Sequence, residues 1–199
     1  LLKIIQQEVG RQQEGFGKIF RDKILPALAE EGVFLLQGLP TLPAHLSFVH
    51  DFFDEEVKAF LHPELLRKKK IVHFLRDDAL YLAIKLRNKQ TLPPSQNGKA
   101  SRRVRYALIQ IPTHYFRRFV SLPVVEGKHT LMFLDDVVRC NLERIFPGYE
   151  VLGSYAVKLT RNADLLIEDE YRGDLVEKIR EGLRKRKIGA PARFLYDPA

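Results

Sequence analysis

The residues of this chain best suited to chemistry are basic side chains on segments that alternate like β-strands. Guanidinium groups bind phosphate oxygens through paired hydrogen bonds, so a strand face that carries several of them could attract a chain of phosphates. The alternative is an ordinary solvated strand face. The candidate polyanion contacts are Arg103, Arg105, Arg117, Arg118, Lys158 and Arg161.

Other arrangements that support catalysis or metal binding are missing from the sequence. The six histidines are dispersed, and the phosphate-binding patterns GxxxxGK[ST] and GxGxxG and the nucleophile pattern GxSxG do not occur. A lone cysteine, Cys140, excludes an internal disulfide and a thiolate-rich metal site. The acidic pair Asp77-Asp78 is typical of a turn, and Asp135-Asp136 of a helix start. We therefore predict no catalytic, cofactor-binding or metal-binding residue.

The charge balance favours negatively charged partners. Lys and Arg number 33 against 25 Asp and Glu, a net charge of +8. Such an excess suits nucleic acid, polyphosphate, nucleotides or an acidic membrane surface, without choosing among them. The RNA-recognition signature is missing, and the RKRK run at 184–187 is the favourable basic end of a helix, so nucleic-acid binding is not expected.

The elements that must position these residues follow from hydrophobic spacing. Apolar residues at helical spacing predict one or two helices over 1–31, with Gly32 as a stop signal, and a helix over 44–61. Alternation predicts antiparallel strands at 79–87 and 103–111, joined by an exposed loop at 88–102. The remaining expected elements are strands at 33–36, 117–123, 129–134, 154–160 and 192–196, and helices at 134–148 and within 170–191.

This order of elements contains no repeated βαβ unit and no internal repeat. It therefore favours an α+β fold, with mixed helices and a mainly antiparallel sheet, preceded by a helical segment. The stretch SYAVKLTRNADLLIEDEY at 154–171 combines a strand, a polar turn and an acidic helix start. We interpret it as mainly structural, with Tyr155, Val157 and Leu159 facing the core.

No apolar run approaches the roughly 18–20 residues that cross a bilayer, and residues 1–10 lack the pattern of a signal peptide. With a single cysteine, a cytoplasmic location is expected, and the basic charge leaves peripheral association with a membrane open. The helical pattern already running at Leu1 indicates part of a longer polypeptide.

Four segments, in their order and spacing, resemble a known family. They are FLRDDALYLAIKL (74–86), RYALIQIPTHYFRRFVSLP (105–123), FLDDVVRCNLERIFPGYEV (133–151) and YAVKLTRNADLLIEDEYRGDLVEKIREGLRKRKIGAPARF (155–194). Together they are similar to the head, or middle, domain of bacterial polyphosphate kinase of the first type. Residues 1–33 resemble the end of its helical N-terminal domain, so the resemblance divides the chain into 1–33 and a head domain at 34–199.

The resemblance implies an enzyme that reversibly transfers the terminal phosphate of ATP to inorganic polyphosphate, with Mg²⁺ and through a phosphohistidine. It places the catalytic phospholipase-D-like domains downstream of this chain, and none of their motifs has a match here. His114 and His129 are therefore not assigned as phosphoacceptors. The fragment is expected to be inactive, to bind neither ATP nor Mg²⁺, and to support homo-oligomerisation through the head. The alternative is a basic α+β module that binds polyanions or nucleic acid without catalysis.

Overall fold

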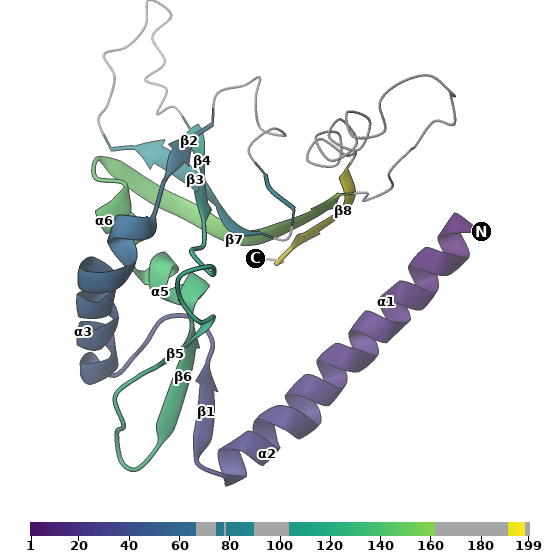
Figure 1. Ribbon diagram of the computed structural model, residues 1–199, viewed down its shortest axis with the longest axis horizontal. Coiled ribbons are helices and arrows are strands. Elements are labelled where there is room, and N and C mark those ends of the chain that lie inside the picture. Colours follow the sequence, from purple (N-terminus) through teal and green to yellow (C-terminus); the bar gives the residue numbers. More distant parts are fainter. Residues whose placement is uncertain (67–74, 78, 90–103, 162–190, 198–199) are drawn as a thin grey trace, which may run out of the picture.

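The computed structural model describes residues 1–66, 75–77, 79–89, 104–161 and 191–197, and for residues 161, 191 and 192 the backbone alone. Two β-sheets and the helices packed against them form the body of the molecule, and an N-terminal helix stands apart from it (Figure 1). The expected α+β class is confirmed. The predicted loop at 88–102 lies mostly outside the described residues, as do the predicted helix within 170–191 and the RKKK and RKRK runs.

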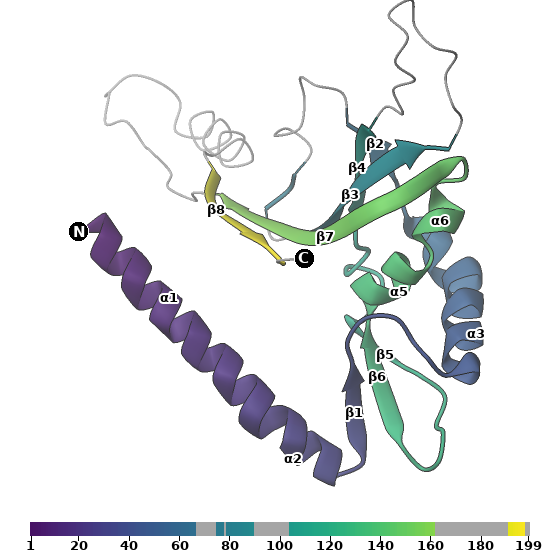
Figure 2. The same cartoon turned by 180° about the vertical axis from the view of Figure 1, so that it is seen from behind.

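The N-terminal helix is almost straight and continuous. It consists of α1 (Leu2–Ile19), a π-helical turn η1 (Phe20–Ile24) and α2 (Leu25–Glu30). Pro26 directly follows the π-helical turn and lacks the N–H that an interior helical residue would donate, and Gly32 ends the helix with φ of 73°. None of its residues is buried, and Figure 2 shows it apart from both sheets when seen from behind.

The smaller sheet has three strands in the order β1-β6-β5. β1 (Val33–Leu36) runs parallel to β6 (His129–Phe133), which pairs antiparallel with β5 (Phe119–Ser121). All three strands were expected from the sequence. The parallel pair was not, because strands so far apart in sequence give no local signal for their partner.

The larger sheet has five antiparallel strands in the order β2-β4-β3-β7-β8. They are β2 (Glu64–Leu65), β4 (Val104–Gln110), β3 (Leu80–Asn88), β7 (Tyr149–Arg161) and β8 (Pro191–Tyr196). The predicted pairing of the strands at 79–87 and 103–111 is confirmed. β3 lies at the centre, because β7 pairs along its other edge.

Helices cover one face of the large sheet. They are α3 (Pro43–Phe52), the π-turn η2 (Phe53–Val57), the 3₁₀ turn η3 (Lys58–Phe60), α5 (Leu134–Cys140) and α6 (Leu142–Ile145). Figure 1 shows α5 where the two sheets meet and α3 beside it. The helix expected over 134–148 is therefore interrupted. At Asn141 the backbone leaves the helical region, and the buried side chain donates a 2.9 Å hydrogen bond to the Val137 carbonyl.

The main core lies between these helices and the large sheet. Leu82, Ile84 and Leu86 of β3 point into it beside Phe53 and are at most 1% exposed. Full burial of such a side chain contributes about 1.5–3 kcal/mol. The opposite face of β3 supports a smaller cluster that includes Tyr81, Leu108, Val157 and Leu159. Val157 and Leu159 thus face a core as predicted, and each face of β3 contributes buried apolar side chains to a cluster.

Candidate functional site

The predicted polyanion contacts do not gather at one place. Arg105 pairs in register with Leu86 at one end of β3, and Lys158 pairs with Leu80 at the other end. At about 3.3 Å per residue, the two positions are separated by about 20 Å along the strand. Arg103 and the side chain of Arg161 lie outside the described residues.

Arg117 and Arg118 are the only neighbouring pair among the described candidates, and both are exposed on the segment that leads into β5. The Arg118 guanidinium lies over the ring of Phe133, 5.2 Å from its centroid, and its Nε is 3.9 Å from Asp135 Oδ1. Arg118 therefore already interacts with Phe133 and lies near the carboxylate of Asp135, which belongs to a neighbouring cluster of charges. Arg105 and Arg117 remain the exposed candidates with no ion pair in the part of the chain that the structure describes.

This cluster of charges, here called the acid–arginine cluster, consists of Arg118, Asp135, Asp136, Arg139 and Asp197. It lines a pocket of about 710 Å³ where the two sheets meet. Arg139 holds it together: Nε is 3.5 Å from Asp136 Oδ1, Nη1 donates to the Ser154 carbonyl at 3.3 Å, and Nη2 donates to Asp197.

Burial disfavours the charged form of Asp136 in this cluster. It raises the pKa of Asp136, and the neighbouring Asp135 charge raises it further, against the opposing effects of Arg139 and of the Gly38 N–H. Asp135 Oδ1 and Arg139 Nε are buried without a hydrogen-bond partner among the described atoms. The cluster joins α5 to β7, through Ser154, and to Asp197 after β8, so its evident role is to fix the joint between elements.

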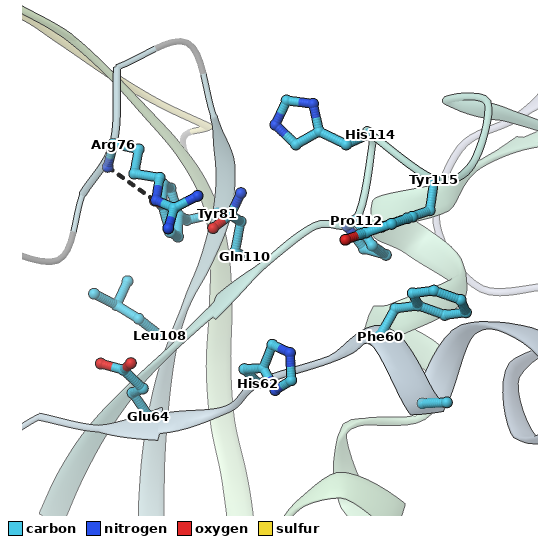
Figure 3. A pocket seen from close by; sticks show the side chains of 11 residues that line it. Phe60, His62, Glu64, Arg76, Tyr81, Leu108, Gln110, Pro112, His114 and Tyr115 are labelled. Atoms are coloured by element: carbon cyan, nitrogen blue, oxygen red, sulfur yellow. Dashed lines mark hydrogen bonds between the residues drawn. The ribbon is translucent and has the colours of Figure 1, made fainter.

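The second pocket, here called the aromatic–histidine pocket, has a volume of about 750 Å³ and lies beside β2 and β4. Figure 3 shows Arg76 and Glu64 across the pocket from Phe60 and Tyr115, with His62 and His114 also turned toward the space between them. The backbone N–H of Arg76 donates a 2.9 Å hydrogen bond to the Tyr81 hydroxyl.

This pocket has no counterpart among the sites expected from the sequence. Its histidines are 52 positions apart in the chain, and Arg76 approaches them because it precedes the central strand β3. No local spacing signals such a convergence. Among the residues that the structure describes, no group of three or more His, Cys, Asp or Glu side chains is placed to hold a metal ion. Within the same residues, no helix is long and apolar enough to cross a membrane.

Comparison with known proteins decides the family. A family model described as the polyphosphate kinase middle domain matches residues 44–199, which is most of the chain. The chain belongs to the polyphosphate kinase family. The resemblance found in the sequence is thereby confirmed, and the matched range includes every residue that lines the aromatic–histidine pocket.

Individual members of the polyphosphate kinase family are similar to this chain in sequence and in structure. The chain is 32% identical over 203 residues to polyphosphate kinase of Vibrio cholerae, covering 99% of this chain and 27% of that protein. It is 30% identical over 186 residues to that of Halalkalibacterium halodurans, covering 91% and 25%. The crystal structure of polyphosphate kinase from Porphyromonas gingivalis superposes with a TM-score of 0.76 at 36% identity, covering 98% of this chain and 26% of that one. The chain thus spans about a quarter of the length of these relatives.

Proposed function

We propose that this chain is the middle-domain part of an enzyme that reversibly transfers the terminal phosphate of ATP to inorganic polyphosphate through a phosphohistidine. The observation that carries this proposal is the match of residues 44–199 to the middle domain of the polyphosphate kinase family. In this proposal residues 1–33 end a preceding helical domain, and the catalytic groups belong to parts of the enzyme that this chain does not include. The chain itself provides a scaffold and does not transfer phosphate.

The environment of the histidines supports a non-catalytic chain. A phosphoacceptor histidine needs a partner that fixes its ring, and cations that neutralise the transferred phosphoryl group. His45 and His50 are held by hydrogen bonds within the fold. Within the described residues, the imidazoles of His62, His114 and His129 have no hydrogen-bond partner. In the described part of the chain, no group of three or more His, Cys, Asp or Glu side chains is placed to hold the Mg²⁺ of the proposed reaction.

Incubation of the 199-residue chain with γ-labelled ATP, Mg²⁺ and polyphosphate tests this proposal. We expect no acid-labile label on the protein and no lengthening of polyphosphate. The H114N and H129N variants serve as controls for any background labelling. Label that appears on the wild-type chain and disappears in either variant would show that the chain performs the chemistry itself.

We propose further that the middle domain supports self-association of a cytoplasmic enzyme. Light scattering coupled to size-exclusion chromatography should then show a mass above that of the 23.1 kDa monomer, in a concentration-dependent manner. Removal of residues 1–33 should leave this association intact, because the proposed interface belongs to residues 34–199. A monomer at all concentrations, or association lost with residues 1–33, would contradict the assignment.

A second candidate function is polyanion binding by the domain itself, which the exposed Arg105 and Arg117 favour. The double variant R105A/R117A should then elute from a polyphosphate matrix at lower salt than the wild type, because salt screens the attraction between exposed charges. K18A/R21A, which removes two exposed charges from the N-terminal helix, is the matched control. Elution of all three proteins at the same salt concentration would show that these arginines are solvated surface residues that do not bind polyphosphate. Stronger retention on RNA than on polyphosphate would indicate a nucleic-acid-binding module.

A further inference from the structure

The aromatic–histidine pocket has no part in the proposed function, yet it has the properties of a ligand site. Its volume of about 750 Å³ lies within the range of about 300–1,000 Å³ typical of small-molecule sites. The base of the pocket consists of residues buried in the fold: Tyr81 is 4% exposed, Leu108 is 6% exposed and Pro112 is buried. These three residues belong to β3, β4 and the turn after β4, which are fixed by the large sheet and its core.

One wall of the pocket is an aromatic shelf. The rings of Phe60 and Tyr115 lie with centroids 4.7 Å apart, and Phe116 packs edge-on against Phe60 at 5.2 Å. Tyr115 is nevertheless 71% exposed. An aromatic ring that is held by its neighbours but open to solvent is the kind of surface on which a nucleobase stacks, with about 1–3 kcal/mol per base.

The remaining walls offer hydrogen-bonding groups of both kinds. Arg76, His62 and His114 can donate to phosphate oxygens, and Glu64 can accept from hydroxyl groups of a sugar. In the part of the chain that the structure describes, none of these four side chains has a hydrogen bond or ion pair. They are therefore available to a ligand without breaking an existing interaction.

We propose that the aromatic–histidine pocket binds a nucleotide, with the base on Tyr115 and the phosphate near Arg76. Figure 3 shows the two groups at opposite sides of the pocket, as a base and a phosphate separated by a sugar require. Glu64 adds a negative charge on the same side of the pocket as Arg76, which disfavours a long chain of phosphates relative to a nucleoside mono- or diphosphate. This inference does not depend on the proposed function, because it concerns binding by the chain alone.

Isothermal titration calorimetry of the 199-residue chain tests the proposal, with AMP and ADP as probes and without Mg²⁺. We expect saturable binding of one nucleotide per chain. Inorganic phosphate, ribose 5-phosphate and polyphosphate should each bind at least tenfold more weakly. Y115A should lower the affinity for AMP at least tenfold through loss of stacking, and R76M at least tenfold through loss of the phosphate contact.

Matched controls separate the pocket from the general surface. Y106A removes an exposed tyrosine of β4, and R21M removes an exposed arginine of η1, and neither residue lines the pocket. Both should bind AMP like the wild type, and circular dichroism should confirm that all four variants are folded. The proposal is overturned if AMP does not bind, if phosphate or polyphosphate binds as tightly as AMP, or if Y115A and R76M bind AMP like their controls.

Discussion

Replacement of Arg139 by methionine should destabilise the fold through the acid–arginine cluster. Methionine retains most of the apolar stem but removes the guanidinium that contacts Asp136, Asp197 and the Ser154 carbonyl. At an effective dielectric constant of about 20, unit charges about 3.5 Å apart attract by about 4.7 kcal/mol, before the cost of desolvation is subtracted. The net effect must therefore be smaller than this value.

The size of the destabilisation by R139M depends on how deeply the charged side chains are buried. The side chains of Arg139 and Asp136 are 23% and 13% exposed, whereas Asp197 is 39% exposed and adds little. Loss of one partner costs about 3–5 kcal/mol in a fully buried pair and about 0–1 kcal/mol in an exposed one. An intermediate value of about 2 kcal/mol is expected, which lowers a urea midpoint by about 1 M for a slope of about 2 kcal/mol per M.

Urea unfolding followed by circular dichroism measures this change. R144M is the matched control, because Arg144 pairs with Asp54 near the surface and should shift the midpoint far less. A double-mutant cycle of R139M with D136N should also give a coupling free energy above about 0.5 kcal/mol, as expected for residues in contact. An R139M midpoint equal to that of the wild type, or no coupling, would refute the argument that Arg139 holds this joint.

Three further predictions concern the half-buried Asp136 and Cys140 and the buried Asn141, which lie in or next to the same helix. Burial raises the pKa of Asp136, so its contribution to stability is complete below the unfolded pKa of about 4 and is lost as the pH rises through the folded pKa. D136N should thus be more stable than the wild type at pH 7, by a margin that shrinks toward pH 4 in urea titrations. Burial, with the Asp136 charge, raises the pKa of Cys140 to about 11. Its thiol should react with Ellman's reagent at pH 8 much more slowly in the folded chain than in urea. N141A should lower the free energy of unfolding by about 2 kcal/mol, because it leaves the Val137 carbonyl and His50 Nδ1 without their partner. An equal stability of N141A and wild type would contradict this account of the interruption between α5 and α6.

Much of the secondary structure could be predicted because its signals are local. The alternation in 79–87 reports that β3 presents Leu82, Ile84 and Leu86 to one face, and the structure confirms it. Gly32 ends the first helix as expected, since glycine adopts the positive φ that this position requires. The family was also recognisable from the sequence, because residue order and spacing in four segments are preserved in the chain itself.

The candidate sites could not be predicted from the sequence, because they depend on contacts between residues far apart in the chain, which leave no local pattern. Asp135 and Asp136 look like an ordinary helix start, and they are one, but the fold also places them against Arg118 and Arg139. The same holds for His114, which seemed isolated in the sequence and shares a pocket with His62 and Arg76 in the structure.

The sequence by itself determined the class of elements, the antiparallel pairing of β3 with β4, and membership of a family. Only the tertiary structure decided that β1 runs parallel to β6, that β7 makes β3 a central strand, and that the candidate basic residues are divided between the large sheet and the segment leading into β5. The physical reason is the range of the interactions. Periodicity and capping act between residues a few positions apart, whereas strand order and pocket walls are fixed by burial of apolar surface between segments far apart in the chain.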